Sequence, residues 1–148
     1  MLSAAELLVG IRRIIRLYED TVRPVCDTYQ ITQIETDILA FLHNNPGKDT
    51  AKDIVELRML QKGNVSQAVE RLIQKGILSR RQDEKDRRRI HLSLTPSGTE
   101  IADAILTARK QFLSRLFKDF SEKELLLYLK LNQKLFANAA GNGDSRDC

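Results

Sequence analysis

The sequence predicts a mainly α-helical fold with one small β-hairpin, and three observations support this prediction. Apolar residues recur at helical spacing along most of the chain. Residues 77–95 instead contain two short segments that read as strands, the second of which alternates strictly between apolar and polar side chains. Capping sequences and stop signals separate the helical segments. The predicted order is four helices, the hairpin and two further helices.

The first helix is expected to begin at Ser3, which forms a capping box with Glu6. Pro24 is expected to kink or end this helix, because proline cannot donate the hydrogen bond of a helix interior. The apolar positions of the helix fall at intervals of three and four residues: Leu7, Leu8, Ile11, Ile14, Ile15, Tyr18 and Val22.

Two capping boxes predict the next two helices, Thr32 with Glu35 and Thr50 with Asp53. The sequence Asn44-Asn45-Pro46-Gly47 stops the helix that starts after Thr32. A turn around residues 59–62 is expected to lead into a fourth helix, whose apolar stripe is Val65, Ala68, Val69, Leu72 and Ile73.

The fourth helix is expected to end at Gly76, in the left-handed cap that favours glycine. Strands are predicted at 77–81 and 89–95, joined by the charged stretch 83–88. Thr95-Pro96 then supplies an N-cap with proline at the first helical position.

The long fifth helix carries apolar residues at Ile101, Ile105, Ala108, Phe112, Leu116 and Phe117. Ser121 with Glu124 caps the last helix, and residues 141–148 are expected to form a disordered tail.

This order predicts a winged helix-turn-helix at about 32–95, inside a single domain that spans 1–148. The helices at about 3–29 and 96–140 carry apolar stripes too large for the short central lobe to cover. We therefore expect them to be N- and C-terminal dimerisation helices in a homodimer.

Positive charge is concentrated in the centre of the chain. The formal net charge is +4, but residues 50–95 contain 11 Lys and Arg against 6 Asp and Glu. Residues 1–49 carry 5 against 7, and residues 96–148 carry 8 against 7. A basic segment between near-neutral ones suggests a module that binds a polyanion.

The fourth helix offers candidate base-reading side chains opposite its apolar stripe. Asn and Gln can pair with adenine edges, and Ser and Arg can contact bases or phosphates. The candidates are Asn64, Ser66, Gln67 and Arg71, with Gln74 on the same face. An ordinary solvated helix face would have similar residues, so the helix alone does not decide the function.

The hairpin favours DNA as the partner. Six cations lie within the ten residues 80–89, against three acids: Arg80, Arg81, Lys85, Arg87, Arg88 and Arg89. Arginine is strongly attracted to a narrow, negative minor groove. The alternative is a surface hairpin whose charges only keep the protein soluble.

Residues 86–95, Asp-Arg-Arg-Arg-Ile-His-Leu-Ser-Leu-Thr, fit the wing signature D-x-R-x-x-x-L-x-L-T at every fixed position. Residues 53–76 end in R-L-x-x-K-G, as the helix-turn-helix of the same family usually does. The chain thus resembles the multiple-antibiotic-resistance regulator (MarR) family from about Ser3 to Ala140.

The resemblance implies a transcription regulator, by family habit a repressor of a nearby promoter. It implies that Arg88 enters a minor groove with Asp86 supporting it, and that the first, fifth and sixth helices form the dimer interface. It further implies an effector, such as a small aromatic molecule, bound between the dimerisation helices and the DNA-binding lobe. Gln61-Lys62-Gly63 departs from the family, which usually has a better N-cap there.

Other functional classes are less favoured. His43, at a helix end, and His91, expected on the outward side of its strand, have no nucleophile with an acidic partner at a suggestive spacing, so an enzyme is not expected. No metal-binding spacing and no cofactor motif occurs. Cys26 is a candidate redox sensor by family resemblance, or a packed thiol, and Cys148 an incidental one.

A winged-helix adaptor or architectural DNA-binding module without ligand response remains the alternative function. No apolar run approaches the ~20 residues of a membrane span. No secretory signal is recognisable, and we expect a cytoplasmic, nucleoid-associated bacterial protein.

Overall fold

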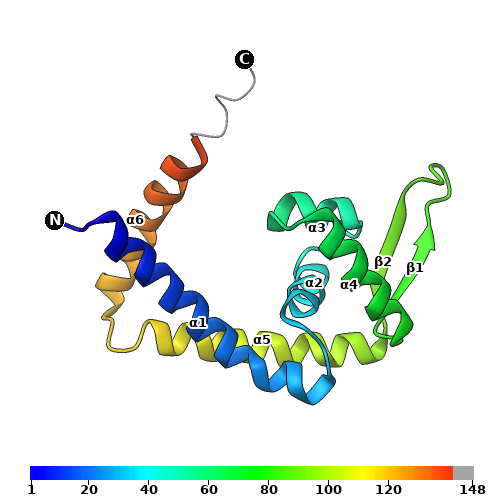
Figure 1. Ribbon diagram of the computed structural model, residues 1–148, viewed down its shortest axis with the longest axis horizontal. Coiled ribbons are helices and arrows are strands. Elements are labelled where there is room, and N and C mark those ends of the chain that lie inside the picture. Colours follow the sequence, from blue (N-terminus) through cyan, green and yellow to red (C-terminus); the bar gives the residue numbers. More distant parts are fainter. Residues whose placement is uncertain (142–148) are drawn as a thin grey trace. The chain divides into compact units, whose positions relative to one another are not determined.

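The computed structural model describes residues 1–141, and its elements follow the predicted order. They are α1 (Ala4–Tyr29), α2 (Gln33–Asn44), α3 (Ala51–Arg58), α4 (Lys62–Gln74), β1 (Leu78–Gln82), β2 (Ile90–Leu94), α5 (Pro96–Leu116) and α6 (Glu122–Gly141) (Figure 1). The fold class is therefore confirmed. Of the expected tail, Gly141 ends α6 and residues 142–148 lie outside the described residues.

The chain divides into two compact units. The first comprises residues 1–112 and so contains α1 to α4, the hairpin and most of α5. The second begins at Leu113 and contains α6. Among the described residues, no helix is both long and apolar enough to cross a membrane.

Helix α1 begins where the capping sequence predicts and continues to Tyr29. The Ser3 hydroxyl accepts from the Glu6 amide and the Glu6 carboxylate accepts from the Ser3 amide, which completes the capping box. Of the two outcomes expected at Pro24, a kink or an end, the end is excluded, because α1 continues through Pro24 to Tyr29. Proline removes one hydrogen bond of a 26-residue helix. The fully buried Val22 and the core-packed Val25 hold the backbone on either side.

The predicted capping box of α2 forms only in part. The Thr32 hydroxyl accepts from the Glu35 amide at 3.3 Å. The Glu35 side chain does not return to Thr32, however. It is fully buried and binds Arg71 of α4 instead. The capping box of α3, Thr50 with Asp53, is complete.

The hydrophobic core lies between α2, α3, α4, the start of α5 and the hairpin. The predicted stripe of α4 supplies four of its buried residues: Val65, Ala68, Val69 and Leu72. Opposite them lie Ile38, Leu39, Ile54, Leu78, Leu92 and Ile105. Burial of this stripe fixes which face of α4 remains outside.

The hairpin agrees with the prediction to within one residue at each strand end. β1 and β2 pair in antiparallel register, with Leu78 opposite Leu94 and Arg81 opposite His91. Gly76, with φ of 74°, adopts the expected left-handed conformation between α4 and β1. The Leu92 amide also donates to the Asp49 carbonyl at 2.8 Å, which attaches β2 to the loop before α3.

Helix α5 begins against the backbone at the start of the hairpin. The Thr95 hydroxyl donates to the Ile77 carbonyl and accepts from the Gly98 amide, confirming the predicted N-cap. Gly98 is buried, and a β-carbon at this position would overlap the Ile77 carbonyl oxygen. Only glycine fits at this contact.

The second unit is organised around aromatic contacts and a predicted cap. Ser121 and Glu124 form the expected capping box of α6. The ring of Phe117 lies 5.3 Å from that of Phe120 and 5.1 Å from that of Tyr128. No residue of α6 is buried.

Candidate nucleic-acid interface

The N-terminal half of α4 presents the predicted polar face to solvent. Asn64, Ser66 and Gln67 are all exposed, opposite the buried Val65 and Ala68. The helix starts after Gln61, whose side chain makes no cap hydrogen bond to the backbone. Its oxygen instead accepts from the Asn64 amide group at 3.1 Å. The unsatisfied backbone amides and the positive end of the helix dipole suit an anionic partner.

Arg71 is engaged inside the protein. Its Nε donates to Glu35 Oε1 at 2.8 Å, while 42% of the Arg71 side chain remains exposed. Lys75 Nζ lies 3.7 Å from Glu35 Oε2, beyond hydrogen-bond distance, and that oxygen has no hydrogen-bond partner. A buried carboxylate must be paired, so Arg71 fastens α4 to α2 through Nε, and only its outer guanidinium nitrogens remain available to another partner.

Arg80 is likewise paired. Its guanidinium forms an ion pair with Glu70 of α4, with both side chains about half exposed. A small groove beside this pair is lined by Ala51, Ser66, Val69, Ile73, Ile90 and Leu92. The ion pair and the groove place the hairpin beside the outer face of α4.

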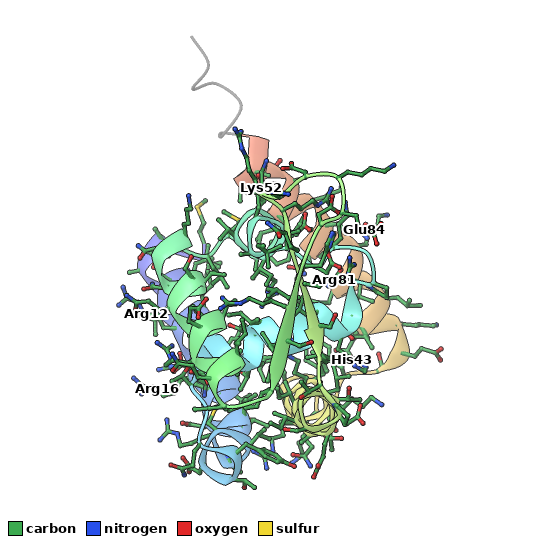
Figure 2. All side chains as sticks on the ribbon, turned by 90° about the vertical axis from the view of Figure 1, so that its right-hand side faces the viewer. Arg12, Arg16, His43, Lys52, Arg81 and Glu84 are labelled. Atoms are coloured by element: carbon green, nitrogen blue, oxygen red, sulfur yellow. The ribbon has the colours of Figure 1, made fainter. Side chains whose placement is uncertain are left out.

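The remaining cations of the hairpin are exposed, and none forms an ion pair with another described residue: Arg81, Lys85, Arg87, Arg88 and Arg89. Figure 2 shows Arg81 along the hairpin and Lys52 of α3 near its tip. A groove of about 630 Å³ lies between α3 and the hairpin and is lined by Lys52, Asp53, Glu56, Asp86, Arg88 and Arg89 among others. Unpaired guanidinium groups on a projecting hairpin are suited to phosphates or a minor groove.

Two aspartates build the turn at the hairpin tip. Asp83 Oδ2 accepts from the backbone amides of Lys85 at 3.0 Å and Asp86 at 2.8 Å. Asp86 Oδ1 in turn accepts from the Arg88 amide at 3.0 Å. Asp86 therefore holds the backbone of Arg88 and leaves the guanidinium free.

His91 does not point outward into solvent, as the alternation suggested. Its Nδ1 lies 2.7 Å from Asp49 Oδ1 and its Nε2 lies 2.8 Å from Asp83 Oδ1, and only 15% of its side chain is exposed. The hydrogen bond from His91 and those from the two tip amides lower the pKa of Asp83 to about 2. The hydrogen bonds that the His91 ring makes with Asp83 and with Asp49 raise the pKa of His91 above its ordinary value.

The surroundings of Cys26 do not favour a reactive thiolate. Burial and the adjacent Asp27 carboxylate raise the pKa of its thiol, with a smaller opposing effect from Arg23. A redox sensor generally needs the pKa lowered. Cys148 lies outside the described residues.

Glu35 and His91 are the two residues that sequence patterns misplaced. Glu35 occupied the last position of a capping box, and nothing local indicated a partner 36 residues away. For His91 the sequence offered no signal either, because Asp49 lies 42 residues before it and only the fold brings the two together.

The MarR family model matches residues 29–89, which include α2 to α4 and the hairpin as far as Arg89. The transcriptional repressor MdtR of Bacillus subtilis (strain 168) is 27% identical over 151 residues, with 99% of this chain and 96% of MdtR covered. The crystal structure of MarR superposes with a TM-score of 0.72 at 27% identity, covering 93% of this chain and 98% of that one.

The fold also matches that of Staphylococcus aureus MepR in its complex with DNA, with a TM-score of 0.77 at 20% identity. The match covers 93% of this chain and 96% of MepR. These relatives are regulators rather than enzymes. With the exposed polar face of α4 and the unpaired wing cations, the comparisons show a DNA-binding transcriptional regulator of MarR type, in which residues 29–89 match the family model.

Proposed function

We propose that this protein is a repressor that binds a pseudo-palindromic operator as a homodimer and is released by a small-molecule signal. The observation that carries the proposal is the pairing of two surfaces. The exposed polar start of α4 lies beside a wing, residues 78–94, that holds five unpaired cations. In this arrangement Asn64, Ser66 and Gln67 read the major groove while Arg88 enters the adjoining minor groove.

Dimerisation is supported by large apolar side chains of α1 and α6 that are exposed among the described residues, 1–141. On α1, six large apolar side chains are at least 38% exposed: Leu7, Leu8, Val9, Ile11, Ile14 and Ile15. On α6, Leu126, Leu127, Leu129, Leu131, Leu135 and Phe136 are at least 47% exposed. A second copy related by a dyad would cover such faces and present two α4 helices about one DNA turn apart.

Effector binding is supported by a cluster of polar groups from four helices of the first unit. Arg109 donates to the Tyr18 hydroxyl at 3.0 Å and to Asp37 at 3.0 Å, and Arg58 lies 3.6 Å from Asp37. One carboxylate faces two guanidinium groups, so the cluster keeps an excess positive charge. The ring of Phe112 lies edge-on to that of Tyr18, 5.3 Å away. An aromatic carboxylate matches this combination.

Footprinting on DNA flanking the gene tests the proposal, with aromatic acids and peroxide as separate additions. We expect one dyad-symmetric protected site that an aromatic acid releases. Release by peroxide alone would assign the signal to oxidation and restore Cys26 as its candidate. Protection without any preferred site would instead identify an adaptor or architectural module.

Salt dependence tests the electrostatic part of the proposal. With roughly 8–10 phosphates neutralised by a dimer, the logarithm of affinity should fall with the logarithm of salt concentration at a slope of about −7 to −9. Fluorescence anisotropy with a labelled operator measures it. A slope shallower than about −3 would contradict recognition through the phosphate backbone.

A further inference from the structure

His91 joins two segments that are far apart along the chain. Through Nδ1 it reaches Asp49, in the loop between α2 and α3, and through Nε2 it reaches Asp83, the first residue of the hairpin loop. The carboxylate groups lie at 2.7 and 2.8 Å from the ring. The imidazole is therefore a side-chain bridge between the helical core and the tip of the wing.

Both hydrogen bonds require the protonated ring. A neutral imidazole has one N–H and can donate to one carboxylate only, whereas the imidazolium donates from both nitrogens. The charged groups around the ring are Asp49 from the loop, Asp83 from the hairpin tip and Arg81 from β1. Arg81 opposes protonation, but the two carboxylates outweigh it, since the net effect is a raised pKa.

The bridge continues toward the cation expected to enter the minor groove. Asp83 accepts from the amides of Lys85 and Asp86, and the Asp86 carboxylate accepts from the Arg88 amide. An unbroken series of hydrogen bonds thus runs from Asp49 through His91 to the backbone of Arg88. No other described side-chain bond or ion pair ties the tip, residues 83–89, to the helices.

We propose that His91 is a positioning residue for DNA binding, whose imidazolium fastens the wing tip to the helical core and so sets where Arg88 stands relative to α4. The inference rests on the proposed function, because it assumes that wing and α4 contact one DNA duplex together. The neutral ring releases one carboxylate, the tip gains freedom, and DNA binding must then pay the entropy of ordering it.

The direction of the pH effect follows from the hydrogen bonds. The bridge is complete when both carboxylates are ionised and the ring is protonated. Its contribution to stability is fully present between about pH 4 and about pH 6.5, the ordinary pKa values of the unfolded groups. It is lost as pH rises through the raised pKa of folded His91. DNA affinity should fall over the same upper interval.

Asp49→Asn separates positioning from net charge. Loss of this carboxylate makes the protein more positive, so simple electrostatics predicts tighter DNA binding. The bridge predicts weaker binding. The backbone bond from the Leu92 amide to the Asp49 carbonyl remains in this variant, so β2 stays attached. Glu84→Gln is the matched control, because it removes an exposed charge from the same hairpin and Glu84 has no described hydrogen-bond or ion-pair partner (Figure 2).

The experiment measures DNA affinity of the full-length protein by fluorescence anisotropy from pH 5.5 to 8.5 at constant ionic strength. Wild type should lose about tenfold in affinity across this range, the value of one charge-assisted hydrogen bond. His91→Gln should bind about tenfold more weakly at pH 6 and show a flat profile. His43→Gln, at the end of α2, should retain the wild-type profile.

Imidazole NMR supplies a readout without DNA. The His91 resonances should titrate above the ordinary range for histidine in wild type, and Asp49→Asn should shift that titration to lower pH. The proposal is overturned if His91→Gln keeps the wild-type pH profile, or if Asp49→Asn binds DNA as tightly as Glu84→Gln. Absence of DNA binding by the wild type at every pH would instead overturn the proposed function.

Discussion

At the scale of single residues, the tip of the wing shows how a carboxylate can order the backbone that carries an arginine. Asp86 accepts from the Arg88 amide and makes no ion pair with the Arg88 guanidinium. The carboxylate therefore orders the backbone that carries the arginine and leaves its charged end available. Lys85, in the same loop, is held by the same kind of bond, since its backbone amide donates to Asp83 Oδ2 at 3.0 Å.

We expect Arg88→Ala to weaken DNA binding far more than Lys85→Ala, which removes only a screened surface charge. Asp86→Ala should also weaken binding, although it makes the protein more positive. Folding should scarcely change, since all three residues are exposed. Operator titrations at fixed salt, with thermal melts as the control, measure both effects. Tighter binding by Asp86→Ala would show that the wing acts only as a diffuse positive surface.

The pair of Glu35 and Arg71 leads to a prediction about stability. Glu35 is fully buried, whereas 42% of the Arg71 side chain is exposed. Arg71→Ala leaves a buried carboxylate with only the more distant Lys75, and should cost about 3 kcal/mol. Glu35→Gln removes the buried charge itself and returns two half-exposed cations to water, so it should cost less than about 1.5 kcal/mol.

Urea denaturation of the single variants and of the double variant measures this asymmetry. Combining Glu35→Gln with Arg71→Ala should be less destabilising than Arg71→Ala alone, because the buried charge is gone. If the two single variants lose the same free energy of unfolding, that loss comes from the broken ion pair and not from a buried carboxylate left without a partner.

At the scale of elements, short sequence patterns predicted the helix caps and turns that depend on contacts between neighbouring residues. The capping boxes at Ser3, Thr50 and Ser121 and the glycine turn at Gly76 rest on contacts within a few residues, and each formed as expected. At Pro24 the helix continues, because the packing of neighbouring side chains against the core compensates for the one hydrogen bond that proline cannot donate.

In the candidate site, too, the sequence predicted the features that depend on neighbouring residues and not those that depend on tertiary contacts. The buried stripe of α4 determined that Asn64 and Gln67 are exposed, which the sequence pattern predicted. The ion pairs of Arg71 and Arg80 and the bridge through His91 were not predictable, because each depends on which side chains long-range folding brings together.

Helix α4 is expected to supply sequence specificity. Gln67→Ala and Asn64→Ala should each cost about 1–3 kcal/mol on the preferred operator and much less on random DNA, because a base contact is lost and the phosphate contacts remain. Parallel titrations with the two duplexes measure the difference. If both duplexes lose affinity equally, these side chains contact phosphates rather than bases.

At the scale of the whole molecule, the exposed apolar faces predict the assembly state. Light scattering at micromolar concentration should give twice the 16.9 kDa mass of the chain. Leu131→Glu on α6 places a charge on a side chain that is 51% exposed in the single chain, so it should lower the measured mass without unfolding the chain. Lys130→Glu, one residue earlier, is the control and should remain dimeric. A monomeric wild type would contradict the dyad arrangement of the operator.

The contact between Gly98 and the Ile77 carbonyl has a consequence for the genetics of the protein. Any replacement that adds a β-carbon at residue 98 must push α5 away from the hairpin. A selection for loss of repression should therefore recover Gly98 variants beside those at Arg88, although Gly98 is buried and is not among the expected DNA contacts. The Arg88 and Gly98 variants would differ in the amount of protein present in the cell extract. Arg88 variants should accumulate to normal levels, whereas Gly98 variants should be depleted by proteolysis.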